Sequence, residues 1–369
     1  MTPRWDIFCK VVDNLGDIGV CWRLARLLHD EHGLAVRLWV DDLAAHQRIC
    51  PGVVICDSQV VSGIEVRHWP DDFSMATAGQ VAEVVIDAFG CGLPAAYLAA
   101  MPADAVWVNL EYLSAEPWVA ACHGLHSRLP DCAAPRRFFF PGFTPHTGGL
   151  MREHDLVARR QRFEDAGAAS AFLATLGVPA DARLKVLLFC YPSVCLPTLI
   201  EAMDEGPAPV LLLIPEGAVA QSVLAQLAAK PRRGFVEARA IPFVPQESFD
   251  ELLWSMDVNI VRGEDSFVRA QWAAKPFVWH IYPQEGGAHL AKLEAFMARY
   301  TAASDPQSNL KPWSDFNLAW NEGTLTAAHW HALKAALPAL SHHAQDWATR
   351  LSTLPELTSA LVQFCAKPV

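Results

Sequence analysis

Residues 5–20 have the sequence WDIFCKVVDNLGDIGV, and this stretch decides the fold. Its first part, Trp5–Val11, has the length and apolar pattern of a buried strand, and a turn rich in Asp, Asn and Gly follows at 12–19. Apolar residues then recur at helical spacing over Val20–Leu28, and Gly33 is a typical helix stop. A strand, a glycine turn and a helix in this order predict one unit of a parallel α/β sheet.

The same order of elements continues along the first half of the chain. Apolar runs of strand length recur at Leu34–Val40, Val84–Asp87 and Val106–Leu110, and irregular loops rich in proline and phenylalanine are expected at 114–150. Strands that alternate with helical patterns are typical of a parallel sheet covered by helices. The first half therefore predicts a Rossmann-like domain.

The second half repeats this arrangement from residue 184 onward. Its predicted strands are Leu184–Cys190, Val210–Ile214, Phe235–Phe243, Asp257–Val261 and Pro276–Tyr282, and its predicted helices are Leu196–Met203, Ala218–Ala229, Gln246–Met256 and Phe267–Ala274, with further helices between His329 and Phe364. The predicted fold class is α/β, with two Rossmann-like domains facing each other across a cleft. Such an arrangement places a ligand in the cleft, at the carboxyl ends of the strands.

The length of 369 residues also favours two domains, because single cores rarely exceed ~300 residues. We expect a first domain at 1–176, a second at 177–344, and a C-terminal helix at 345–369 that joins the first. A charged, helix-like stretch at 151–176 is the expected hinge.

Composition excludes several classes of protein. With 52% hydrophobic residues the chain is not disordered, and no apolar run reaches the ~20 residues of a membrane span. Asp6 and Lys10 stand where a signal peptide needs an apolar core, so a soluble cytoplasmic protein is expected. The net charge of −11 has the wrong sign for a general nucleic-acid binder and suits a basic partner. The ten cysteines form no C-x-x-C pair, so reduced thiols are expected and a zinc site is not.

The turn after the first strand is the first candidate site. Gly16 and Gly19 do not complete a dinucleotide fingerprint, and Asp13 and Asp17 would repel a pyrophosphate. Two carboxylates flanking one turn are able to hold a nucleophile and take its proton. The alternative is structural: Asp13 as a turn residue and Asp17 as the helix N-cap. Spacing alone leaves both interpretations open.

Two further candidate sites lie at strand ends in the second half. In Arg262–Ser266 (RGEDS), the arginine and the backbone amides at a helix start suit an anion, although an acidic first turn with a serine cap explains the same residues. The second group is aromatic, with one amide beside it, and suits a stacked base, although such residues are more often core. It consists of Phe189, Tyr191, Phe249 and Tyr282, with Gln246 nearby. The sequence contains no D-x-D, which removes the usual carboxylate pair of a metal-held nucleotide sugar.

Five blocks of the sequence closely resemble those of the bacterial elongation factor P arginine rhamnosyltransferases. They are residues 5–20, Asn109–Glu116, Phe139–Phe143, Pro245–Phe249 and Arg262–Phe267. The blocks follow one another in order and span nearly the whole chain, which makes them far more specific than a single glycine loop.

This resemblance implies an inverting glycosyltransferase of the GT-B type that works without a metal or other cofactor. Its members transfer L-rhamnose from dTDP-β-L-rhamnose to one arginine of elongation factor P. The modification activates that factor for the rescue of ribosomes stalled on polyproline. The implied partners are elongation factor P and the nucleotide sugar, with no nucleic acid and no membrane.

The resemblance also implies roles for individual residues, with the acceptor on the first domain and the donor on the second. The implied acceptor-side carboxylates are Asp13 and Asp17, with Asp17 favoured as general base, and Glu264 supports the sugar or catalysis. The thymine and deoxyribose are enclosed by Phe189, Tyr191, Gln246 and Phe249, and the diphosphate region is bound by Arg262, Gly263, Asp265, Ser266 and Tyr282. The acceptor protein is contacted by Asn109, Glu111, Tyr112 and Glu116. Which of Asp13, Asp17 and Glu264 takes the proton is not decided by the sequence.

Other functions remain as alternatives. The same fold serves transferases and nucleotide-sugar epimerases that act on small molecules. A non-catalytic binder of the translation factor is less consistent with two acidic residues at a strand end. A dinucleotide oxidoreductase is least consistent, because its fingerprint is missing.

Overall fold

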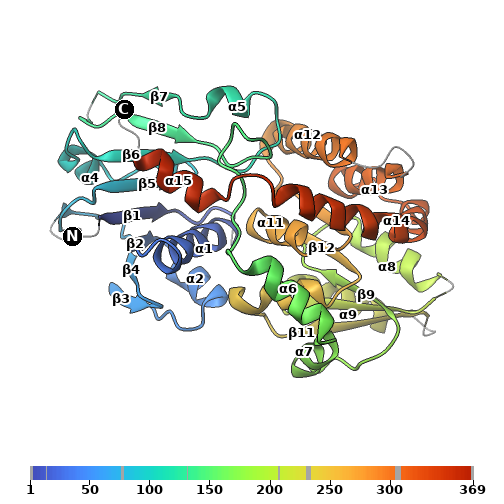
Figure 1. Ribbon diagram of the computed structural model, residues 1–369. Coiled ribbons are helices and arrows are strands. Elements are labelled where there is room, and N and C mark those ends of the chain that lie inside the picture. Colours follow the sequence, from blue (N-terminus) through green and yellow to red (C-terminus); the bar gives the residue numbers. More distant parts are fainter. Residues whose placement is uncertain are drawn as a thin grey trace. The chain divides into compact units, whose positions relative to one another are not determined.

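The computed structural model describes residues 3–366 except 14, 76–78, 131, 207, 230–233 and 304–308 (Figure 1). The chain forms two compact units. The first comprises Met1–His154 together with Thr353–Val369, and the second comprises Asp155–Ser352. Within the described residues, no helix combines the length and the apolar character needed to cross a membrane.

The first unit is built on an eight-stranded sheet. Its strands are β1 (Arg4–Cys9), β2 (Ala35–Val40), β3 (Ser58–Val61), β4 (Ile64–His68), β5 (Val84–Ala88), β6 (Val106–Leu110), β7 (His126–Ser127) and β8 (Arg136–Phe139), in the spatial order β3-β4-β2-β1-β5-β6-β8-β7. Only β3 and β7, at the two edges, run antiparallel to their neighbours. The six parallel strands alone have the order 3-2-1-4-5-6, which is the Rossmann order. Successive parallel strands are added on one side of β1 as far as β4 and then on its other side from β5, so the strand order reverses between β1 and β5.

Strands β1, β2, β5 and β6 confirm the predictions from the apolar runs. The strands that the sequence analysis missed lie toward the edges. In β4 the burial alternates along Ile64–His68, because part of the strand is solvated. β8 lies inside 114–150, where irregular loops were expected.

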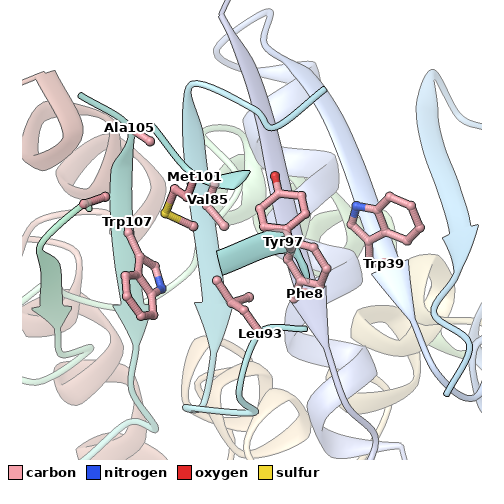
Figure 2. Close-up of a cluster of buried hydrophobic side chains, with 9 residues drawn as sticks. Phe8, Trp39, Val85, Leu93, Tyr97, Met101, Ala105 and Trp107 are labelled. Carbon is pink, nitrogen blue, oxygen red and sulfur yellow. The ribbon is translucent and has the colours of Figure 1, made fainter. Parts of the chain in front are cut away.

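Large aromatic side chains fill the core on one face of this sheet (Figure 2). The rings of Phe8 and Trp39, on neighbouring strands, are stacked with centroids 5.8 Å apart. Tyr97, from the helix α4 (Ala95–Ala100), packs against Phe8 at 4.8 Å. Burial of each such side chain stabilises the fold by roughly 2–3 kcal/mol. This core fixes the carboxyl edge of β1, which carries the first candidate site.

In the described residues of the first unit, the other helices are α1 (Gly16–Asp30), α2 (Leu43–Ile49), α5 (Val119–Cys122) and α15 (Leu357–Ala366). The last of these returns from the far end of the sequence. Leu357 N–H donates to the carbonyl of Leu150 at 3.1 Å. Gly149 has a positive φ of 71°, and a Cβ there would lie 1.8 Å from the carbonyl oxygen of Pro355, so only glycine allows this approach.

The second unit has a sheet of five parallel strands. They are β9 (Leu184–Leu188), β10 (Val210–Pro215), β11 (Val236–Ile241), β12 (Val258–Arg262) and β13 (Phe277–His280), in the order β11-β10-β9-β12-β13. This is the order 3-2-1-4-5, again Rossmann-like, with its reversal point between β9 and β12. All five strands were predicted. The helical elements are α6 (Leu156–Asp165), α7 (Ala169–Thr175), α8 (Leu196–Asp204), α9 (Ala218–Ala228), η1 (Gln246–Ser248), α10 (Phe249–Trp254), α11 (Asp265–Trp272), η2 (Glu285–Gly287), α12 (Ala288–Ala302), α13 (Lys311–Glu322) and α14 (Ala327–Leu351).

The boundaries of the units differ from those expected from the sequence. The charged stretch that was expected as a hinge forms α6 and α7, which belong to the second unit. Arg159 of α6 contacts Asp250 of α10 at 3.3 Å, and Arg160 donates to the carbonyl of Trp272 at 2.5 Å. At the other end, α14 runs unbroken to Leu351, so the first unit resumes at residue 353 instead of 345.

Candidate active site

Two acidic residues follow the first strand of the first unit. β1 ends at Cys9 and α1 begins at Gly16, so Asp13 lies in the connecting loop and Asp17 in the first helical turn. Asp17 Oδ2 accepts hydrogen bonds from the backbone N–H groups of Val12 and Asp13, both at 2.8 Å. These bonds tie the loop to the helix and orient a carboxylate that is only 1% exposed.

Of the structural alternative for these two residues, the part on Asp13 is confirmed and the part on Asp17 is wrong. Leu15 is the N-cap of α1, so Asp17 is not the cap. Asp13 does act as a turn residue, because its carbonyl accepts from Gly16 N–H at 2.6 Å. Glycine at position 16 lets the Asp13 carboxylate approach the helix start closely, since a Cβ there would lie 2.4 Å from Asp13 Oδ2. Asn14, in the same loop, lies outside the described residues.

A tyrosine from another loop reaches the same carboxylate. The hydroxyl of Tyr112, two residues after β6, donates to Asp17 Oδ1 at 2.9 Å. The Tyr112 ring is stacked on Phe89, which follows β5, with centroids 4.2 Å apart and planes at 10°. Because β1, β5 and β6 are neighbours, three loops meet at the carboxyl edge of the sheet, where Rossmann domains bind ligands. The sequence analysis placed Asp17 and Tyr112 here but missed Phe89.

The other predicted acceptor-side residues form two separate pairs. Asn109, near the end of β6, donates through Nδ2 to Glu111 Oε1 at 2.5 Å. Glu116 accepts from the Ser114 hydroxyl at 2.9 Å. Among the described residues, no hydrogen bond or ion pair joins Glu116 to Asp17.

In the second unit, the guanidinium of Arg262 lies on two aromatic rings. Its central carbon is 4.9 Å from the ring centroids of both Phe189 and Tyr191. Phe189 also packs against Phe249 at 5.6 Å, and Tyr191 against Tyr282 at 5.6 Å. The aromatic residues and the arginine that the sequence predicted therefore form one cluster at the carboxyl ends of β9, β12 and β13. Tyr191 and Phe249 are buried and Tyr282 is exposed, so the cluster is partly core and partly surface.

The loop after β12 is shaped by glycine. Gly263 has φ 64°, and its carbonyl accepts from the Trp279 indole at 2.8 Å. α11 then begins at Asp265 with Glu264 as N-cap, so the amides of Asp265 and Ser266 are in the first turn, where a helix has no internal partner for them. Ser266 is not the cap: its hydroxyl donates to the carbonyl of Arg262.

Two polar contacts complete this part of the site. Gln246 Nε2 donates to Asp265 Oδ2 at 3.1 Å, which joins the amide predicted to read a base to the helix start. Glu264 lies 3.9 Å from the amine of Lys292, on α12. Lys292 was missed, because α12 was not predicted.

His280 is a further residue that the sequence analysis did not single out. It is the last residue of β13 and lies directly opposite Arg262 on β12. Its ring packs against Tyr191 at 5.2 Å. Burial, with Arg262 nearby, lowers the pKa of His280 to about 4. The imidazole is therefore neutral at physiological pH and adds no charge beside Arg262.

Among the described residues, neither a reactive thiol nor a metal centre adds to the site. All ten cysteines are free thiols. Burial raises the pKa of Cys190 to about 12, which makes its thiol unreactive. Among the described side chains, no group of three or more His, Cys, Asp or Glu residues is arranged to hold a metal ion.

Comparisons with known proteins identify the family. The family described as "Elongation-Factor P (EF-P) rhamnosyltransferase EarP" matches residues 5–366. A protein-arginine rhamnosyltransferase from Pseudomonas putida is 47% identical over 99% of each chain. A solved structure described as the structural basis for EarP-mediated arginine glycosylation of translation elongation factor EF-P is 37% identical over 98% of each chain, with a TM-score of 0.70.

A more distant likeness supports the fold alone. A UDP-glucosyltransferase from Polygonum tinctorium superimposes with a TM-score of 0.55 at 10% identity, covering 99% of this chain and 98% of that one. Two Rossmann-like units in one chain are the GT-B fold of such glycosyltransferases, as predicted. The chain is therefore a glycosyltransferase and belongs to the EarP family of elongation factor P (EF-P) rhamnosyltransferases.

Proposed function

We propose that this enzyme transfers L-rhamnose from dTDP-β-L-rhamnose to an arginine side chain of EF-P, with inversion at the anomeric carbon. The family and the protein-arginine rhamnosyltransferase relative support the sugar and the type of acceptor. The observation that carries the catalytic assignment is the carboxylate of Asp17, which three donors orient at the carboxyl edge of the first sheet.

The acceptor chemistry requires such a carboxylate. An arginine guanidinium is protonated at neutral pH and is a poor nucleophile. In the proposed step, a guanidinium nitrogen forms a bond to the anomeric carbon, its proton passes to Asp17, and the bond from that carbon to the diphosphate breaks. Asp13, packed beside Gly16, supplies a second carboxylate to hold the planar group.

The donor is assigned to the second unit. Phe189, Tyr191 and Phe249 offer aromatic faces for the thymine and deoxyribose, and Gln246 offers an amide for the base edge. Arg262, Tyr282 and the first-turn amides of Asp265 and Ser266, positioned by Gly263, bind the diphosphate in this proposal. Glu264, beside Lys292, supports the sugar.

The leaving diphosphate gains charge as the bond breaks. Preorganised donors stabilise such charge without an acid, and here Arg262 and the start of α11 provide them. The proposed reaction therefore needs no metal and no other cofactor. Inversion further requires the base and the leaving-group site on opposite faces of the sugar, and the proposal assigns them to different units.

The acceptor is proposed to be the folded EF-P protein, docked partly through Asn109, Glu111, Tyr112 and Glu116. The net charge of −11 favours encounter with a basic loop that presents an arginine. Because EF-P acts on ribosomes, the proposal places the enzyme in the cytoplasm. Its product is the activated factor that rescues ribosomes stalled on polyproline.

Intact-mass analysis tests the reaction directly. EF-P is incubated with the enzyme and dTDP-β-L-rhamnose, and then digested and mapped. The expected result is one added deoxyhexose on a peptide containing arginine, and none when Asp17→Asn replaces the wild-type enzyme. Donor turnover without any change in the mass of EF-P would instead indicate a small-molecule acceptor.

A further inference from the structure

Phe89 has a backbone conformation that a phenylalanine rarely adopts. It follows β5 with φ 61°, in the left-handed region that favours glycine. Its N–H donates to the carbonyl of Leu110, the last residue of β6, at 2.6 Å. Strained residues of this kind concentrate at functional sites, where the surrounding structure holds them in place.

This conformation brings the Phe89 ring onto the ring of Tyr112. The two planes are within 10° of parallel, with centroids 4.2 Å apart. The Tyr112 hydroxyl in turn donates to Asp17 Oδ1 at 2.9 Å. The loops after β5 and β6 are thus joined twice: by the backbone bond from Phe89 to Leu110 and by the stacked rings.

Asp17 itself is almost saturated with donors. An ionised carboxylate has about four acceptor positions. Two on Oδ2 are used by the N–H groups of Val12 and Asp13, and one on Oδ1 is used by Tyr112. Among the described residues, no donor occupies the remaining position on Oδ1, and this position is the one available to an incoming guanidinium. The direction of the Tyr112 hydroxyl therefore decides where that position points.

We propose that Phe89 is a positioning residue for the transfer reaction. It fixes the Tyr112 ring, and through the Tyr112 hydroxyl it aims the free position of Asp17 at the acceptor. This inference rests on the proposed function, because it takes Asp17 as the proton acceptor. Phe89 acts through Tyr112 and contacts neither the acceptor nor the donor.

A split between kcat and KM separates this role from a purely structural one. Loss of a hydrogen bond to a charged group lowers kcat about tenfold or more in Tyr112→Phe. Loss of the stacked ring in Phe89→Ala lowers kcat about 2- to 10-fold. The KM for dTDP-β-L-rhamnose is unchanged in both variants.

The experiment is a double-mutant cycle with EF-P as acceptor. Phe89→Ala and Tyr112→Phe are measured singly and together, and Phe89→Tyr is included as the conservative variant that keeps the ring. The expected result is that Phe89→Tyr retains wild-type kcat and that Phe89→Ala has no further effect in the Tyr112→Phe background. An equal loss in both backgrounds would overturn the inference, because Phe89 would then act independently of Tyr112.

A matched control measures general damage to the fold. Phe163→Ala removes a half-buried phenylalanine that packs on Trp254 at 5.4 Å in the second unit. Its kcat is expected to match wild type, and a loss equal to that of Phe89→Ala would overturn the proposal.

Asp17→Asn distinguishes a failure of the proposed function from a failure of this inference. If that variant is fully active, the proposed function fails; if it is inactive while the Phe89 and Tyr112 variants behave as wild type, only this inference fails.

Discussion

Asp17 is held by donors from two separate segments of the chain: the loop before α1 and the loop after β6. A carboxylate with only a structural role in the loop would be replaceable by an amide, since an amide oxygen also accepts from N–H groups. A general base is not replaceable in this way, because an amide does not take up a proton at neutral pH. Exchange of this one residue therefore distinguishes the two roles.

We expect Asp17→Asn to lower kcat about 10²- to 10⁴-fold while the affinity for dTDP is unchanged. Steady-state kinetics with EF-P and calorimetric titration with dTDP measure the two quantities. Asp41→Asn is the matched control, because Asp41 Oδ1 accepts from the N–H of Val11 in the same loop at 2.9 Å and has no assigned role in catalysis. Wild-type turnover by Asp17→Asn would leave Asp17 with the structural role alone.

The sequence could identify charged site residues beside a predicted strand. Asp17 and Arg262 belong to this group, because an apolar run, a glycine turn and a helix signal surround each of them. Phe89 also follows a predicted strand, but an apolar side chain there gives no chemical signal. Its importance comes from a positive φ and from a ring partner 23 residues later, and both are products of the tertiary structure. His280 was likewise hidden, because only the register of β12 with β13 sets it opposite Arg262.

At the scale of elements, the start of α11 is proposed to replace a metal ion. Its first-turn amides and Arg262 both direct positive charge toward an anion. We therefore expect rhamnosyl transfer to EF-P to keep its wild-type rate in an excess of EDTA. Parallel assays with EDTA and with added Mg²⁺ or Mn²⁺ provide the measurement. A strict dependence on either ion would contradict the assignment of the leaving-group site.

The helices α6, α10 and α11 are joined by one buried carboxylate. Asp250 of α10 accepts two hydrogen bonds from the guanidinium of Arg269 on α11, and both side chains are buried. Asp250→Asn removes the carboxylate charge that pairs with this buried guanidinium, so we expect a loss of about 3 kcal/mol in the free energy of unfolding. Urea unfolding measures this loss.

Arg159→Ala is the control for this prediction. Arg159 contacts the same carboxylate from α6, but its side chain is 34% exposed. Its removal is expected to cost less than about 1 kcal/mol. Equal costs for the two variants would show that burial does not determine the strength of this network.

Elements were predictable where an apolar run of strand length marked them, as in β10 and β13 of the second unit, whose residues are all buried. The domain boundary was not, because the polar composition of α6 suggested a solvated linker. Its arginines are instead anchored to Asp250 and to the carbonyl of Trp272. A charge pattern shows that a helix is polar, but not which partner neutralises it.

At the scale of the molecule, buried histidines such as His46 and His280 make stability depend on pH. Burial lowers the pKa of His46 and of His280 to about 4, whereas both titrate near 6.5 in an unfolded chain. Between these values the unfolded state binds more protons, so the free energy of unfolding falls as pH falls. The contribution is fully present above pH 6.5 and is lost toward pH 4, at up to roughly 3 kcal/mol for each residue.

We expect His46→Phe to flatten this pH dependence. In the described structure neither ring nitrogen of His46 has a hydrogen-bond partner, and the ring packs on Trp22 at 4.8 Å, so phenylalanine keeps the contact and removes the titration. Urea unfolding of both proteins at pH 7.5 and pH 5 gives the comparison. An unchanged difference between the two pH values would mean that His46 is not a source of the acid sensitivity.

Selectivity for the acceptor is a property of the whole molecule, because it depends on the carboxylates at the reaction centre and on contacts remote from it. If Asp13 and Asp17 hold a planar guanidinium, an EF-P variant with lysine in place of the acceptor arginine should react far more slowly, because an ammonium is a point charge and cannot present two nitrogens in one plane. Free arginine should also be a poor acceptor substrate, since contacts remote from the reaction fix the nucleophile against the anomeric carbon.

The net charge of −11 adds a third expectation: kcat/KM for EF-P falls as the salt concentration rises, because screening weakens long-range attraction to a basic acceptor. The assay compares EF-P, its lysine variant, a peptide of the acceptor loop and free arginine at low and physiological salt. Equal rates for EF-P and free arginine would show that no docking surface contributes, and the enzyme would then be better described as a small-molecule transferase.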